Sequence, residues 1–190
     1  MKLKSVKKIR DEWCDSEDGK ISKESLNDLK KHLEGNNTDN LCEAMSLVTD
    51  ARIIAFVPLI EKCLTNEWSI VREFAIGKLL GLLKLPAYAE IGLKMAQEDE
   101  SSGVRSLALF NIGNVLKDVE MGLRKKIAAY LIKVFYDEGE RNTLRHSAYT
   151  SILTDMDVHI LDRPSAARDL KIPEEVNWEL VEKFKEKYGL

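Results

Sequence analysis

The chain has 190 residues, of which 44% are hydrophobic and 32% charged, and its formal net charge is −3. This balance suits a single folded domain, and the slight acidity argues against nucleic acid as a partner, because proteins that bind it usually carry a basic stripe. No apolar run of about 18 residues occurs, so we expect no membrane-spanning helix.

Residues 1–35 are expected to form two helices that cap one end of the fold. The first helix lies within residues 1–14, and the polar sequence DSEDGK follows it as a turn. Ser22 is the predicted N-cap of the second helix, because a serine hydroxyl can accept from the free backbone amides of the first turn. Gly35 is expected to end that helix.

Between residues 40 and 154 one pattern returns three times. A polar loop precedes a helix that begins with an apolar residue and an arginine, and an alanine follows one turn later. The arginines are Arg72, Arg105 and Arg145, which stand 33 and 40 positions apart. Apolar residues recur at helical spacing after each of them, and such a period predicts a stacked array of helical repeats. We expect each arginine to hydrogen-bond the polar loop just before it.

The best copy carries a resemblance to a known family. The segment PLIEKCLTN, which starts at Pro58, is followed by Val71-Arg72 and Ala75, and it resembles a HEAT repeat of the short type also called PBS-lyase HEAT-like. The copies at Val104 and Leu144 match less well. The resemblance implies an all-α fold, namely a short right-handed α-solenoid of HEAT-like helical hairpins. Such repeats are generic scaffolds, so the motif predicts fold and says little about function.

The repeat pattern stops at residue 155. Residues 155–173 are predicted to be an irregular insertion, mostly loop with a short helical piece, and long ordered loops are often functional. Residues 174–190 are expected to form a last helix that caps the array, since the end repeats of a solenoid need polar covers. The whole chain is therefore predicted to be one domain of about ten helices.

No catalytic or metal-binding motif is present. The three histidines do not pair at ligand spacing, and no cofactor is expected. Asp155, Asp157 and His159 alternate, and two interpretations fit them: they could meet a cation if the segment is extended, or they are solvated loop residues. Three cysteines without a CxxC pair predict free thiols in a reducing cytoplasm.

A binding surface can be placed by register, because the second helix of each HEAT pair lines the concave side. The positions on that stripe are Glu73, Lys84, Ser106, Phe110, Asn114, Lys117, His146 and Thr150. Phe110 stands out among polar neighbours. It could be an exposed aromatic anchor, or it could fill space left by Gly77 in the preceding copy. Asp155, Asp157 and His159 of the insertion complete the predicted partner-binding set.

The residues favour a monomeric, non-catalytic module that binds another protein. By resemblance, small stand-alone proteins of this kind include bacterial regulatory and toxin-neutralising (immunity) proteins, which makes a toxin one expected partner. The alternative is a helical-repeat enzyme of the alkylpurine DNA glycosylase kind. That enzyme needs a basic groove containing a carboxylate and tryptophans, whereas Trp13, Trp68 and Trp178 fall on terminal segments and a turn. A chromophore-lyase subunit is suggested by the family label alone.

Overall fold

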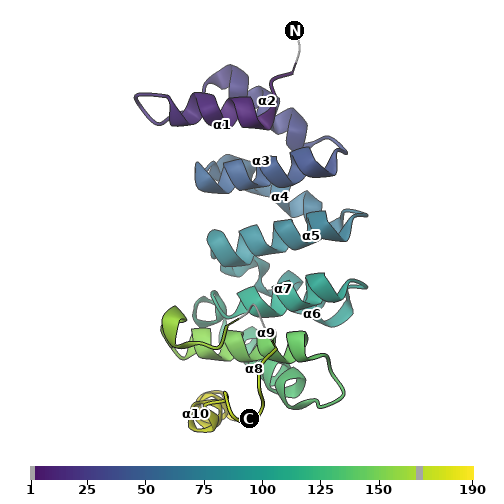
Figure 1. Ribbon diagram of the computed structural model, residues 1–190, viewed down its shortest axis with the longest axis vertical. Coiled ribbons are helices and arrows are strands. Elements are labelled where there is room, and N and C mark those ends of the chain that lie inside the picture. Colours follow the sequence, from purple (N-terminus) through teal and green to yellow (C-terminus); the bar gives the residue numbers. More distant parts are fainter. Residues whose placement is uncertain (1–2, 166–168) are drawn as a thin grey trace. The chain divides into compact units, whose positions relative to one another are not determined.

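The computed structural model describes residues 3–165 and 169–190, and this part of the chain holds ten α-helices and no strand (Figure 1). The predicted all-α class is confirmed. The chain divides into two compact units, Met1–Leu83 and Lys84–Leu190. That the whole chain is one domain stays a prediction.

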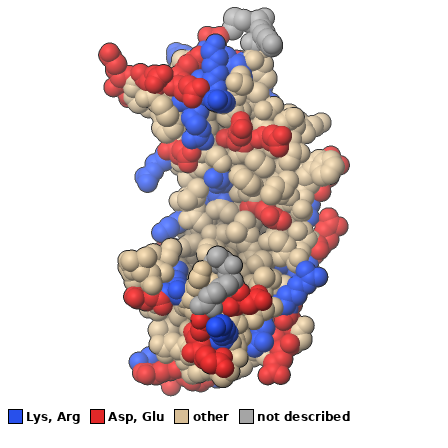
Figure 2. All heavy atoms as spheres, viewed as in Figure 1, with Lys and Arg blue, Asp and Glu red and all other residues tan. Residues whose placement is uncertain are grey.

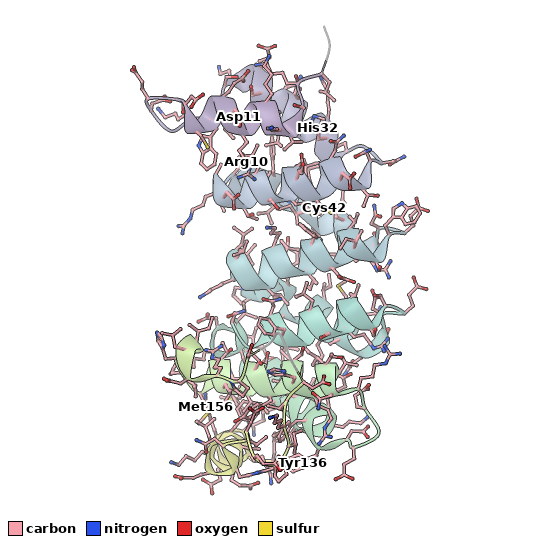
Figure 3. The ribbon with its side chains drawn as sticks, in the orientation of Figure 1. Arg10, Asp11, His32, Cys42, Tyr136 and Met156 are labelled. Carbon is pink, nitrogen blue, oxygen red and sulfur yellow. The ribbon has the colours of Figure 1, made fainter. Side chains whose placement is uncertain are left out.

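The first unit begins with two capped helices, α1 (Val6–Cys14) and α2 (Lys23–Leu33). Ser22 caps α2 as predicted, because its hydroxyl accepts from the amide of Ser25 at 3.2 Å. The helix α3 (Thr38–Asp50) packs against both of them. Arg10 of α1 donates to Asp50 at the end of α3, with a nitrogen–oxygen distance of 2.7 Å (Figure 3).

The second half of this unit contains one short helix flanked by 3-10 turns and one longer helix that ends in a π-helical segment. A 3-10 turn (Ile54–Phe56) leads into α4 (Val57–Lys62) and a second 3-10 turn (Cys63–Thr65). Pro58 lies in the first turn of α4, where its missing amide costs no hydrogen bond. The helix α5 (Ser69–Ile76) continues as a π-helix (Gly77–Leu82). Apolar side chains of α3, α4 and α5 form the core, including Leu41, Met45, Ile60, Val71, Ala75 and Leu79.

The second unit is a bundle around a buried helix. A 3-10 turn (Pro86–Tyr88) precedes α6 (Ala89–Glu98), which packs on α7 (Ser102–Ile112). A further 3-10 turn (Leu116–Asp118) leads to α8 (Met121–Tyr136), the longest helix described. The helix α9 (Asn142–Asp155) packs against both α7 and α8.

The C-terminal part corrects two predicted boundaries. Asp155 is the last residue of α9, so the irregular segment starts one residue later than expected, and its short helical piece is a 3-10 turn (Ile160–Asp162). The last helix, α10 (Trp178–Tyr188), begins four residues after the predicted start. Asn177 sets that start, because its side chain accepts from the amide of Leu180 at 3.0 Å and forms the N-cap.

The predicted hydrogen bonds from the repeated arginine to the loop before it are present in two of the three copies. Arg72 donates to the carbonyls of Asn66 and Glu67, at 2.8 and 3.1 Å. Arg105 donates in the same way to Asp99 and Glu100, at 2.8 and 3.2 Å. Arg145 differs: its Nε donates to the carbonyl of Phe135, in the last turn of α8. The loop before α9, residues 137–141, is two residues longer than the loops before α5 and α7, residues 66–68 and 99–101.

Candidate functional site

The predicted stripe contains both accessible and inaccessible residues. Lys84 and Lys117 are exposed, and Glu73, Ser106, Phe110 and Asn114 are half-buried. Two of the polar groups are turned toward their own unit. The hydroxyl of Ser106 lies 2.8 Å from that of Ser147, and the Asn114 amide donates to the carbonyl of Asn111.

His146 and Thr150 are buried, with exposed fractions of 6% and 5%. The prediction that they contact a partner from the surface is therefore wrong. Ten of the 14 residues of α9 are buried, so the helix lacks the broad exposed polar face of an ordinary amphipathic helix. The burial of α9 could not be predicted from residue types, because polar residues occupy many of its buried positions. Ser151 is an example: its hydroxyl donates to the carbonyl of Leu109 inside the unit.

Asp155 is also removed from the predicted surface. Its side chain is fully buried, and it accepts from the hydroxyl of Tyr188 at 2.9 and 3.0 Å and from Lys187 at 2.7 Å. The carboxylate thus joins the end of α9 to the end of α10. Burial, and next the negative charge of Asp155, raise the pKa of the Tyr188 phenol well above its ordinary value.

Asp157 and His159 are exposed but do not converge with Asp155. Asp157 forms an ion pair with Lys117, whose hydrogen bond holds the pKa of that carboxyl below its usual range. His159 instead accepts from the amide of Leu161 at 3.3 Å and begins the 3-10 turn. Among residues 3–165 and 169–190 no group of three or more metal-binding side chains is brought together. The alternation of these residues does not make a common site.

The insertion contains a pair of exposed apolar residues that were not among the binding residues predicted from the sequence. Ile160 and Leu161 are 71% and 84% exposed, the highest fractions among the large hydrophobic side chains described. They stand on the 3-10 turn at the outer end of the segment. We call residues 158–163 the insertion tip. A signal was present in the sequence, since two adjacent aliphatic residues stand there without a helical partner.

A single arginine holds the insertion tip in place. Arg163 donates through Nε and Nη2 to the carbonyl of Val158, at 2.9 and 2.6 Å. Its Nη1 donates to the hydroxyl of Thr154 on α9 at 2.7 Å. Because a guanidinium is rigid and planar, this set of bonds fixes both the turn and its distance from the helix. Partial burial lowers the pKa of Arg163 from its ordinary value.

A groove of about 340 Å³ lies beside the tip. Its lining includes Leu161 and Arg163 of the tip, and Asn177 and Leu180 at the start of α10. Tyr149 also lines it, and the Tyr149 hydroxyl accepts from the amide of Asn177 at 2.7 Å. The tip is therefore an apolar projection with a recess next to it, which is a shape suited to contact with another polypeptide.

Aromatic rings pack between the start of α10 and the end of α8. The ring of Trp178 lies 5.8 Å from that of Phe135 and 6.1 Å from that of Tyr136. Tyr136, at the end of α8, also donates to Glu182 on α10 (Figure 3). Trp178 thus contributes to packing inside its own unit.

The cysteines are free, as expected from their number and spacing. Cys14 is exposed, Cys42 is half-buried and Cys63 is buried. Burial raises the pKa of the Cys42 and Cys63 thiols, which keeps both in the less reactive protonated form at neutral pH.

Charged side chains of both signs are interspersed on the face drawn in Figure 2. A continuous basic stripe is not visible on that face, and a duplex-binding surface would require one. In the described part of the chain, no helix is long and apolar enough to cross a membrane.

Searches against family models, curated proteins and solved structures found no match to this chain.

Proposed function

We propose that this chain is a non-catalytic module that binds another protein. The observation that carries the proposal is the insertion tip, where Ile160 and Leu161 are exposed on a turn fixed by Arg163. Exposed aliphatic side chains on a rigid support lose little conformational entropy on binding, which favours a protein interface. The adjacent groove offers a place for side chains of the partner.

The framework is proposed to be a short HEAT-like α-solenoid. Support comes from inside the chain, because Arg72 and Arg105 stand 33 positions apart and make the same two bonds to the preceding loop. A shared local geometry at a repeat-length spacing is what stacked helical hairpins require. Scaffolds of this type are generic, and they commonly present surfaces for binding.

The resemblance to small stand-alone HEAT-like proteins suggests a regulatory or toxin-neutralising role. We propose that the protein acts as a monomer in the cytoplasm and engages its partner, a toxin in the second case, by direct contact. The proposed contact set in the second unit is Lys117, Asp157, His159 and the apolar pair of the insertion tip. Lys117 and Asp157 belong together because their ion pair ties the start of the insertion to the segment after α7.

The experiment starts with a pull-down from the native host, followed by isothermal titration calorimetry with the captured protein. Truncation of anchor residues in such interfaces commonly weakens binding by about 2 kcal/mol, roughly thirtyfold in Kd. We expect this loss for the double variant Ile160→Ser/Leu161→Ser. Met121→Ser is the matched control, because Met121 is also an exposed aliphatic residue of the second unit, at 55%.

Binding of the double variant with the parental Kd would contradict this site. A salt-dependent gel shift with duplex DNA would instead favour the glycosylase-like alternative, since phosphate contacts weaken steeply as salt rises. Circular dichroism of each variant shows whether its fold is intact. The turn should persist in the double variant, because Arg163 donates to a backbone carbonyl and to Thr154 rather than to either substituted side chain.

A further inference from the structure

The first two copies of the repeat allow an internal comparison. In the first loop the amide of Trp68 donates to the side chain of Asn66 at 2.9 Å, and Arg72 donates to the carbonyls of Asn66 and Glu67. In the second loop, 33 positions later, the amide of Ser101 donates to Asp99 at 2.9 Å, and Arg105 makes the matching bonds. The two loops therefore have the same backbone framework.

The side chains on that framework differ in one respect. Trp68 is 55% exposed and Ile70 is 45% exposed in the first loop. The equivalent residues of the second loop are Ser101 and Gly103. The second loop makes the matching arginine bonds without them, and its Ser101 adds a helix cap, because the hydroxyl accepts from the amide of Val104. Neither large apolar side chain is therefore needed for the arginine bonds that hold the turn. The indole N–H of Trp68 also has no hydrogen-bond partner among the described residues.

The apolar pair stands on a rigid base. Arg72 is 7% exposed, so its two hydrogen bonds to the loop are shielded from water. Trp68 immediately precedes α5, and Ile70 is in its first turn. A tryptophan that is already ordered and half exposed is the residue type most enriched among the strong contacts of protein interfaces.

The charge beside the pair indicates the kind of partner. Glu67 is an exposed carboxylate next to Trp68, and residues 66–71 contain no lysine or arginine. The next base along the chain, Arg72, is buried and donates to the loop. Apart from the exposed Lys62, five positions before Glu67, no exposed base lies near this carboxylate in the sequence. An exposed carboxylate repels phosphate and anionic lipid, and it attracts lysine and arginine.

We propose that Trp68 and Ile70 form a docking surface for a polypeptide segment whose apolar side chains are flanked by lysine or arginine. The apolar residues of the partner cover the indole and the isoleucine, and its basic residue pairs with Glu67. This surface consists of residues of the first unit and shares none with the insertion tip of the second unit. It acts without any contribution from Leu161.

The probe is a random library of 12-residue peptides displayed on phage and selected on the full chain. Selected peptides are then synthesised with a fluorescent label and titrated by anisotropy. The test variant is Trp68→Ser/Ile70→Ala, in which Trp68 receives the residue type that the second loop carries. Met121→Ser and Leu161→Ser are the controls, and thermal melts show that each variant is folded.

We expect the selected peptides to contain more lysine and arginine than acidic residues, and to bind the test variant at least tenfold more weakly than the parent. Their affinity for both controls should be unchanged. Reversal of the neighbouring charge by Glu67→Lys should also weaken binding.

Equal binding to the parent and the test variant overturns the inference, as does a set of peptides without a basic excess. Loss of binding only in Leu161→Ser overturns it too, while supporting the proposed site at the insertion tip. Sedimentation with phosphatidylserine vesicles provides the last comparison. Vesicle binding that disappears in the test variant would show that the apolar pair docks on a membrane, and would overturn a polypeptide partner.

Discussion

Gly113 lies directly against Ser151, which stands 38 positions later on α9. The amide of Gly113 donates to the Ser151 hydroxyl at 3.0 Å, and that hydroxyl donates in turn to the carbonyl of Leu109. A Cβ atom on Gly113 would lie 2.6 Å from the Ser151 carbonyl oxygen and 2.7 Å from its Cα. The contact is between backbones, so it cannot be relieved by the rotation of a side chain.

We therefore expect Gly113→Ala to destabilise the protein strongly. Overpacking in well-packed cores costs about 1–3 kcal/mol and occasionally more, and the upper end applies because the backbone of α9 would have to move. Urea unfolding followed by circular dichroism measures the loss. Gly139→Ala is the control, since a Cβ there would meet only the exposed Asp137 side chain, at 3.2 Å. Similar midpoints for the two variants would contradict the close approach of α7 and α9.

Asp155 is expected to be essential for holding α10. Asp155→Ala leaves the buried Tyr188 hydroxyl without its acceptor and Lys187 without its counter-ion. Removing one partner of a buried hydrogen bond costs about 1–3 kcal/mol, and more when the group is charged. A fall in the urea midpoint should come with greater hydrogen exchange in α10. Glu179→Ala, which breaks an exposed ion pair on the same helix, should have little effect. Equal protection of α10 in parent and Asp155→Ala would argue against this role.

Tyr188 should make stability depend on alkaline pH. Its pKa is raised in the folded state, so between its ordinary value of about 10 and the higher folded value the unfolded chain has lost a proton that the folded chain retains. Its contribution to stability is therefore fully present below about pH 10 and declines as pH rises through that window. Tyr188→Phe cannot ionise, so its free energy of unfolding should fall less steeply above pH 10. Parallel profiles for the two proteins, from urea melts between pH 8.5 and 11.5, would contradict the assignment.

Arg105 is predicted to stabilise the loop before α7. Arg105→Ala removes two hydrogen bonds from a charged donor to the carbonyls of Asp99 and Glu100. Hydrogen bonds to charged groups contribute about 1.5–3 kcal/mol each at most, and partial exposure reduces this, so we expect a loss of about 1–2 kcal/mol. Arg141→Ala, which loses one exposed bond to Ser102, is the control. Thermal melts should rank the two variants clearly, and the reverse order would show that the loop does not depend on this arginine.

The repeated pattern of a polar loop followed by an arginine has a direct physical counterpart in the two matching loops. A single arginine satisfies two loop carbonyls that would otherwise lose hydrogen bonds near the start of a buried helix. This requirement involves residues only five and six positions apart, so it can be recognised in the sequence. Helical periodicity and the Ser22 cap are local in the same sense and were confirmed, whereas Arg145 bonds the end of α8 in place of the loop before it.

The sequence alone determined the all-α class, most helix positions and the loop-binding role of Arg72 and Arg105, because these depend on contacts between near neighbours in the chain. Only the tertiary structure decided which surfaces are accessible. The polar residues His146, Thr150 and Asp155 are read from sequence as solvated, yet helices from distant parts of the chain cover α9 and supply partners such as Tyr188. Trp68, Ile160 and Leu161 are apolar types expected in a core, yet more than half of each side chain is exposed. Burial is set by long-range packing, and the local pattern of residue types does not contain that information.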